Sequence, residues 1–161
     1  MRASMRQMSV VGVFAVTLVV VLGGTALAQS SNSEVGTWKL NLAKSKGSSL
    51  KSGTVKIEAA GAGIKTIVDG VDANGTARHY EFTANYDGKD NPISGNSPDG
   101  DMVALTRINA TTTKAVNKKS GKMTTTATFV VSSDAKMRTN TATGTNALGR
   151  TVNRVTVWDK Q

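Results

Sequence analysis

The sequence predicts an all-β protein, an up-and-down antiparallel meander closed into a barrel of about 8–10 strands. Apolar and polar residues alternate with a period of two, as in the stretch from Thr54 to Ala59. Glycine and Asn-Gly turn signals separate such stretches, and no long apolar stripe has the spacing of a helix face. A two-sheet β-sandwich is the alternative, because alternation alone does not determine how the strands are connected.

Turn residues divide the chain into strands that should pair in sequence order. Asp72-Ala73-Asn74-Gly75, Ser120-Gly121 and Ala147-Leu148-Gly149 carry residues that tolerate the positive φ of tight hairpins. Closing this meander would remove the two exposed sheet edges, which favours a barrel. We expect strands near residues 35–40, 53–60, 63–71, 76–86, 101–108, 112–118, 122–132, 136–144 and 150–158.

A leader precedes this domain. Two early arginines are followed by an uncharged apolar run, Val10 to Leu22, that is too short to span a bilayer, and Ala26-Leu27-Ala28 has the small-x-small pattern of a cleavage site. We predict a signal peptide over residues 1–28, cleavage before Gln29, and export to the periplasm or the medium. The mature chain, residues 29–161, suits a single domain, and we expect a monomer without a transmembrane span. The sequence has no Cys, so disulfides cannot stabilise it.

Residues for catalysis are scarce. The single histidine, His79, alternates with Tyr80 and Phe82 and is expected on the outer surface, as are Glu58 and Glu81, so no triad and no acid/base pair is assigned. We therefore predict no enzyme activity and no cofactor.

The segment YDGKDNPISG, Tyr86 to Gly95, is a candidate metal-binding loop because aspartates are frequent in and after it. Its spacing does not match the alternating ligands, sixth-position glycine and final glutamate of an EF-hand loop. Its Asp-Gly, proline and glycines instead suit a change of direction. We interpret it as a corner of the chain and predict no metal site.

Positive charge is concentrated in the C-terminal half. Residues 102–161 have ten basic and two acidic side chains, whereas residues 29–101 have eight and nine. Nucleic acid is not expected as a partner, because this half offers only Phe129 and Trp158 for stacking on bases. Lys118, Lys119 and Lys122 are interpreted as a solvated hairpin tip, with attraction to an anionic envelope surface as the alternative.

Two short segments resemble the calycin families, which include lipocalins and fatty-acid-binding proteins. Gly36-Thr37-Trp38-Lys39-Leu40 is similar to their first-strand G-x-W motif, and Val155 to Lys160 resembles their chain end. The resemblance implies a barrel base built from Gly36 and Trp38, with Arg154 or Arg150 packed over the indole. Asn41 to Ser52 is too short for the helical lid of fatty-acid-binding proteins, and Thr156-Val157-Trp158 replaces their carboxylate-binding Arg-x-Tyr.

A broader resemblance is to uncharacterised secreted bacterial proteins that share GTWKLN, a following K-S, YDGKD-x-P-x-x-G and an ending like VWDK. These segments are here Gly36 to Asn41, Lys44-Ser45, Tyr86 to Gly95 and Val157 to Lys160. The resemblance extends over most of the mature chain and implies export, but it carries no activity.

The predicted function is that of an exported, lipocalin-like binding protein for a small hydrophobic or amphiphilic ligand. The alternative is an envelope or extracellular interaction or inhibitor module that binds an anionic surface or a protein partner through its exterior. Candidate ligand-binding residues are Tyr80, Phe82 and Phe129 for an apolar tail and Arg107 for an anionic head group.

The sequence does not determine which face of three of the strands points inward. Arg107 alternates with Val103 and Leu105, but the opposite face from Met102 to Ile108 is also apolar, and the nearest acids in sequence are Asp99 and Asp101. The threonine-rich alternate positions from Met123 to Val131 and from Met137 to Thr143 would line a roomy interior if they point inward. If they point outward, they are a polar outer surface, because a shift of one residue exchanges the two faces.

Overall fold

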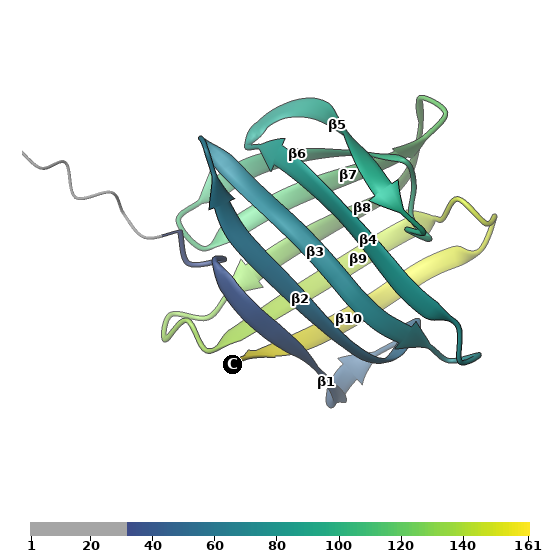
Figure 1. The fold of residues 1–161 in the computed structure, drawn as a ribbon, viewed down its shortest axis with the longest axis horizontal. Coiled ribbons are helices and arrows are strands. Elements are labelled where there is room, and N and C mark those ends of the chain that lie inside the picture. The colour runs from purple at the N-terminus through teal and green to yellow at the C-terminus, as the bar shows by residue number, and fades with distance from the viewer. Residues whose placement is uncertain (1–31) are drawn as a thin grey trace, which may run out of the picture.

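The computed structural model describes residues 32–161 as one closed barrel of ten antiparallel strands, in which each strand pairs with the next and the last pairs with the first (Figure 1). The closed meander is confirmed, and the sandwich alternative is wrong. The predicted signal peptide lies outside the described residues. Residues 32–161 contain no helix that is long and apolar enough to cross a membrane. The strands are β1 (Gly36–Lys46), β2 (Leu50–Ala60), β3 (Gly63–Asp72), β4 (Ala77–Asn85), β5 (Asp87–Gly95), β6 (Met102–Asn109), β7 (Thr112–Lys119), β8 (Lys122–Val131), β9 (Met137–Thr145) and β10 (Thr151–Lys160).

Alternation along each strand produces the barrel interior. In β2, Val55 and Ile57 are buried, while Lys56 between them and Glu58 after them are exposed. Successive side chains of a strand point to opposite faces, so one face of the meander collects the apolar residues and closes around them. The core cluster includes Trp38, Ile57, Ile64, Val68, Val103, Leu105, Ala127, Val131 and Trp158.

The segment that the sequence assigns to a corner is a strand, β5. Its first half pairs with β6 and its second half with β4, with an irregular register between Asp87 and Asp90. Only Asn91 and Ile93 of β5 are even half-buried. The corner interpretation is therefore wrong, because a strand with almost no buried side chain lacks the apolar alternation that identifies the others.

The structure shows which faces of β6, β8 and β9 point into the barrel. Val103, Leu105 and Arg107 of β6 point inward, whereas Ile108 is exposed on the outside. In β8 the inner face is Thr125, Ala127, Phe129 and Val131, while Met123 lies at the exposed end of the strand. In β9 the inner face is Arg138, Asn140 and Ala142, so the inward alternative for Met137, Thr139, Thr141 and Thr143 is wrong.

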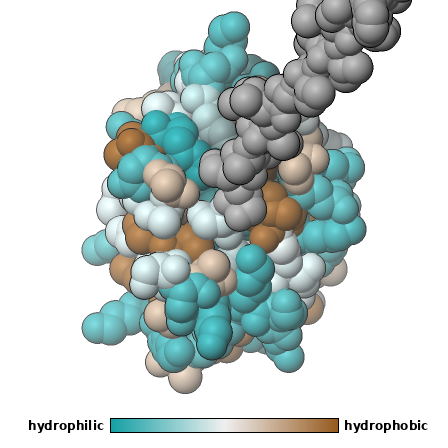
Figure 2. Space-filling view, turned by 90° about the vertical axis from the view of Figure 1, so that its left-hand side faces the viewer, coloured by the Kyte–Doolittle hydropathy of each residue, from teal (hydrophilic) through white to brown (hydrophobic). Residues whose placement is uncertain are grey.

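The chain segment before β1 closes one end of the barrel. The backbone oxygen of Glu34 accepts a hydrogen bond from Trp38 Nε1 at 2.8 Å, and Trp38 has no exposed surface. Asn32 Nδ2 donates to the Tyr86 hydroxyl at 2.8 Å, and Ser33 Oγ donates to the Ala110 oxygen of the β6–β7 turn at 3.1 Å. Viewed from this end, apolar side chains form small separate areas among polar ones (Figure 2).

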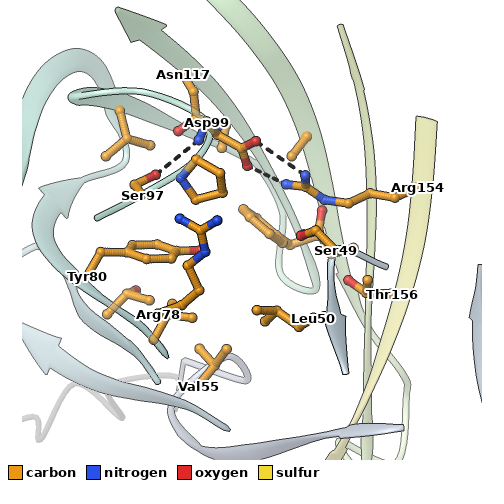
Figure 3. A pocket seen from close by; sticks show the side chains of 18 of the residues that line it. Ser49, Leu50, Val55, Arg78, Tyr80, Ser97, Asp99, Asn117, Arg154 and Thr156 are labelled. Atoms are coloured by element: carbon orange, nitrogen blue, oxygen red, sulfur yellow. Dashed lines mark hydrogen bonds and ion pairs between the residues drawn. The ribbon is translucent and has the colours of Figure 1, made fainter. Parts of the chain in front are cut away.

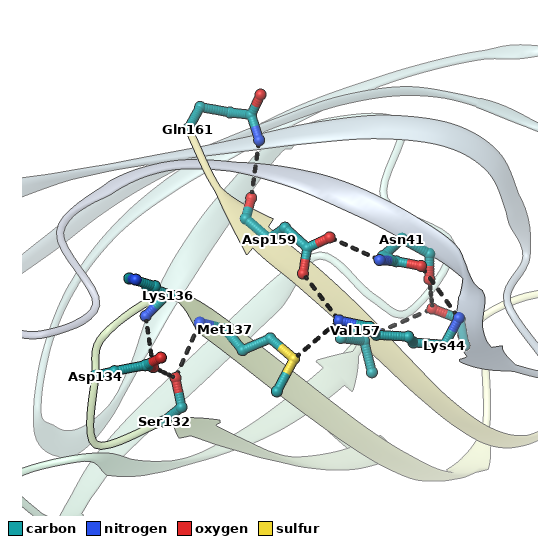
Figure 4. A network of polar contacts seen from close by, with 10 residues as sticks. Asn41, Lys44, Ser132, Asp134, Lys136, Met137, Val157, Asp159 and Gln161 are labelled. Carbon is teal, nitrogen blue, oxygen red and sulfur yellow. Dashed lines mark hydrogen bonds and ion pairs between the residues drawn. The ribbon is translucent and has the colours of Figure 1, made fainter.

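A bulge in β1 holds the first strand against the last. The register between β1 and β10 slips between Asn41 and Lys46. Asn41 Nδ2 donates to Asp159 Oδ2 at 2.6 Å, and Ser45 Oγ donates to the Asn41 oxygen while accepting from the Val157 amide at 2.9 Å (Figure 4). Lys44 Nζ lies 3.8 Å from Asp159 Oδ1. These polar contacts fix the seam at which the barrel closes.

Candidate functional site

The interior contains a cavity of about 100 Å³ that is lined by residues from strands β2 to β10. Its walls are largely apolar, from Val55 and Val68 on one side to Phe129 and Trp158 on the other. Polar side chains from several strands interrupt this surface, chiefly Thr66, Tyr80, Asn117, Arg138 and Asn140. Burial raises the pKa of Tyr80 to about 12, which is the effect expected for a phenol in a dry environment.

A wider pocket of about 430 Å³ lies at the open end of the barrel and shares Ser49, Arg78, Pro98 and Arg154 with the cavity. The hairpins β1–β2, β3–β4 and β9–β10 form its rim. Arg78 Nη2 lies 2.9 Å from Asp72 Oδ2. Asp72 also accepts the backbone N–H of Thr76, which lowers the pKa of its carboxyl. The cavity therefore opens toward a polar mouth.

The segment Ser97–Asp99 lies across this mouth and is held by charge (Figure 3). Arg154 Nη1 donates to Asp99 Oδ1 at 3.3 Å, and Arg154 Nη2 binds Asp99 Oδ2. The Ala147 amide donates to the Pro98 oxygen at 3.1 Å. Burial acts to lower the pKa of Arg154, but the hydrogen bonds and charge of Asp99 outweigh it, so that pKa is raised. Access to the cavity is limited by this fastened segment.

The closed end holds a second group of charges around Glu34, whose side chain is 1% exposed. Glu34 Oε1 accepts hydrogen bonds from the hydroxyl groups of Thr113 and Tyr86. Arg107 Nη1 lies 3.3 Å from the same oxygen, and Arg138 Nη2 lies 3.6 Å from Oε2. Burial, and next the charge of Glu34, raise the pKa of Tyr86 to about 12.

The structure brings three of the four predicted ligand-binding residues together. Tyr80, Phe82 and Phe129 all line the cavity. Arg107 points inward but pairs with Glu34 and stacks on the Tyr86 ring at 3.7 Å, so neither Asp99 nor Asp101 is its partner and it does not line the cavity. Ligand binding by these residues stays a prediction.

Of the predicted base residues, Gly36 and Trp38 lie at the closed end and Arg154 lies at the mouth. Lys160, which pairs with Trp38 across β1 and β10, places its Nζ 5.0 Å from the Trp38 ring centroid. The expectation that Arg154 or Arg150 packs over Trp38 is therefore corrected: both line the mouth pocket. The last strand runs from the mouth to the base, so only its final residues reach Trp38.

Sequence reasoning missed Glu34, Arg138, Asn140 and Thr66. Glu34 precedes the first predicted strand, where no alternation indicates burial. In β9 both faces are polar, so the alternation gives no reason to prefer Arg138 and Asn140 over the threonines.

Residues 32–161 contain no cluster of three or more His, Cys, Asp or Glu side chains that could hold a metal ion. His79 Nδ1 lies 2.6 Å from Asp69 Oδ1, and both side chains are more than 60% exposed on the outer surface. Neither His79 nor Asp69 lines the inner cavity or the mouth pocket.

Comparison with known proteins bears on the fold. No protein-family model matches the sequence, and no curated protein matches it. Among solved structures, the zebrafish ileal bile-acid-binding protein in complex with cholic acid matches with a TM-score of 0.50 and 13% identity, over 80% of this chain and 99% of that one. The chain thus forms a ten-stranded antiparallel barrel whose fold resembles that of this solved protein.

Proposed function

We propose that this protein is an exported binding protein that holds a small amphiphilic molecule inside its barrel. The observation that carries the proposal is the apolar cavity that opens into a polar mouth. Ligand sites are typically concave and mostly apolar, with a few placed polar groups that orient the guest. The similar barrel that binds cholic acid supports this type of use. The signal-like N-terminus supports export.

The size of the cavity limits the guest. Drug-sized ligands occupy pockets of roughly 300–1,000 Å³, whereas this cavity measures about 100 Å³. A guest with a bulky ring system therefore does not fit within the interior alone. It would have to extend into the mouth pocket of about 430 Å³, past Asp99 and Arg154. The inner cavity suits a short apolar group.

Titration with a fluorescent amphiphile tests this proposal, with native mass spectrometry of the protein purified from its own envelope to detect a bound small molecule. Ala127 lines the cavity, so Ala127→Leu should fill it and weaken binding about tenfold or more. Val130→Leu is the matched control, because Val130 points outward and is 42% exposed. Equal affinity in both variants, or no saturable binding to the wild type, would contradict an internal site.

A second candidate function is binding to an anionic surface through the mouth rim. Arg150 lines the mouth pocket, and Lys51 and Lys122 are exposed; none of the three has an ion pair within residues 32–161. Such a field would attract anionic headgroups and weaken with salt. Cosedimentation with phosphatidylglycerol vesicles at low and high salt tests it. Binding that is unchanged in a Lys122→Gln, Arg150→Gln double variant would contradict it.

A further inference from the structure

The inner end of the cavity contains polar atoms without hydrogen-bond partners. Arg138 Nε, Asn140 Oδ1 and Thr66 Oγ1 are each fully buried and unpartnered within residues 32–161. All three residues line the same cavity, Arg138 and Asn140 from β9 and Thr66 from β3 across the barrel. An unpaired polar group in an apolar interior is costly, so native proteins normally provide each one with a partner.

Arg138 is the most poorly satisfied of these groups. Its side chain is 6% exposed, and burial lowers its pKa although the charge of Glu34 opposes this effect. Its Nη2 lies 3.6 Å from Glu34 Oε2, longer than a normal hydrogen bond, and its guanidinium lies over the Phe129 ring at 4.1 Å. A guanidinium has five N–H donors in a planar fork, so most of this capacity is unused.

Charge balance at the closed end indicates what is missing. Two guanidinium groups, Arg107 and Arg138, share one carboxylate, Glu34, which leaves one positive charge in excess. Arg107 is 25% exposed and can be solvated, whereas Arg138 faces the cavity. The ion pairs Asp72–Arg78 and Asp99–Arg154 at the mouth are already neutral. A monoanion in the cavity would balance the charge, and a dianionic phosphate would exceed it.

We propose that the inner cavity is a binding site for a short-chain monocarboxylate. Arg138 Nε donates to the carboxylate, and Asn140, two residues along the same face, contributes its amide nitrogen after a rotation of the amide that exchanges its nitrogen and oxygen. The Thr66 hydroxyl is a third donor. The apolar body lies against Val68, Phe82 and Phe129. This inference rests on the proposed function and names its ligand class.

The chain length follows from the volume. An engineered cavity of about 150 Å³ in another protein holds benzene, so a cavity of about 100 Å³ suits a body of a few carbons. A long-chain fatty acid does not fit without displacing the Ser97–Asp99 segment from the mouth. Butyrate is the suitable probe, with butanol as the neutral molecule of similar shape and laurate as the long-chain acid.

Nuclear magnetic resonance titration of the folded mature protein, followed at the methyl groups of Val68 and Val103, gives the affinities. We expect saturable shifts with butyrate, and binding about tenfold weaker or more for butanol, because a charge-assisted hydrogen bond is lost. Arg138→Gln should remove the preference for butyrate, and Lys114→Gln, at an exposed position outside both pockets, should retain it. If Arg138→Gln does not fold, Asn140→Leu serves, with a smaller loss expected.

Each outcome separates this inference from the proposed function. Equal affinities for butyrate and butanol, or an unchanged preference in Arg138→Gln, would overturn the carboxylate site while leaving a binding barrel in place. Laurate bound more tightly than butyrate, with the same dependence on Arg138, would overturn the short-chain class. Water alone in the cavity, with no saturable shift from butyrate, overturns the inference; loss of fluorescent amphiphile binding as well overturns both proposals.

Discussion

Trp38 is the largest fully buried side chain in the described part of the chain, and its environment is both apolar and hydrogen-bonded. Its indole packs in the core cluster with Val55 and Ile57, and its Nε1 donates to the Glu34 oxygen at 2.8 Å. A buried tryptophan that satisfies its one donor combines a large burial contribution with a fixed orientation. It joins the first strand to the segment that closes the barrel.

Trp38→Ala should therefore lower the free energy of unfolding by about 3–5 kcal/mol, because the cavity left behind cannot collapse fully. Urea denaturation of the mature protein measures this loss. Leu42→Ala is the control, since Leu42 lies on the same strand and is 46% exposed, and it should change stability by about 0.5 kcal/mol or less. A loss below about 1 kcal/mol for Trp38→Ala would show that this residue does not organise the base.

The two tyrosines of the sequence, Tyr80 and Tyr86, both have pKa values raised to about 12. Because the folded protein binds the two phenol protons more tightly than the unfolded chain does, these groups stabilise the fold fully below the tyrosine pKa of the unfolded chain, about 10. This stabilisation is lost as the pH rises toward 12. The native protein should therefore develop tyrosinate absorbance near pH 12, and the urea-unfolded protein near pH 10. A native midpoint near 10 would contradict the burial of both phenols. Tyr80→Phe and Tyr86→Phe should each reduce the loss of stability in this window.

Single residues also show where sequence reasoning reaches its limit. Tyr80, Phe82 and Phe129 were placed in the interior because an aromatic residue on an alternating strand has a strong preference for the buried face. Arg107 could not be assigned a partner, since Glu34 is distant in sequence and lies before the first strand. Arg138 could not be identified either, because it lies on a strand with two polar faces, where an arginine usually faces solvent.

Among the elements, β5 depends on backbone geometry more than on side-chain burial. Gly95 ends this strand with φ of 97° opposite Tyr80 of β4. A Cβ atom at this position would lie 2.3 Å from the His79 oxygen and 2.8 Å from Tyr80 Cα. The glycine of the YDGKD-x-P-x-x-G segment is thus required for the close approach of β5 to β4.

Gly95→Ala should destabilise the protein substantially more than Gly121→Ala. Gly121 also has positive φ, 76°, but nothing lies within 4 Å of its added Cβ, so it reports backbone strain alone, about 1–2 kcal/mol. Gly95→Ala adds a backbone clash and should cost roughly twice that or more. Urea denaturation of the two variants measures the difference. If both variants lost the same free energy of unfolding, the added Cβ at position 95 would be accommodated by a movement of β5 away from β4 that costs no stability.

The seam between β1 and β10 brings three separate sequence segments into contact. Asn41 of GTWKLN, Ser45 of the K-S pair and Asp159 of VWDK meet in one hydrogen-bonded network around the β1 bulge. These residues are far apart in sequence, so their contact was not predictable from any one segment. The network joins the first strand to the last, where the barrel closes.

On the scale of the whole molecule, the fold class and the approximate number of strands were predictable, whereas β5 was not. Period-two alternation with turn signals reports buried faces, and nine of the ten strands have one. The meander order followed because short turns pair neighbouring strands. The cavity could not be predicted, since its volume depends on how inward side chains from many strands pack together.

The barrel is open at the mouth and sealed at the base by a segment that begins only a few residues after the predicted cleavage site. Cleavage before Gln29 leaves Asn32, Ser33 and Glu34 in the mature chain, where they contact Tyr86, Ala110 and Trp38. A cut seven residues further on would remove all of these contacts. It would also leave Arg138, 6% exposed, without its only ion-pair partner within residues 32–161.

A chain that starts at Gly36 should therefore be less stable than one that starts at Gln29, by about 3–5 kcal/mol, because a buried cation loses its partner and Trp38 becomes exposed. Urea denaturation compares the two chains. Glu34→Gln in the longer chain retains the packing and removes the charge, so it should show part of the loss in unfolding free energy. The remaining loss then measures the effect of uncovering Trp38. If the two chains unfolded at the same urea concentration, the segment before β1 would contribute nothing to stability, and the strands alone would hold the barrel closed.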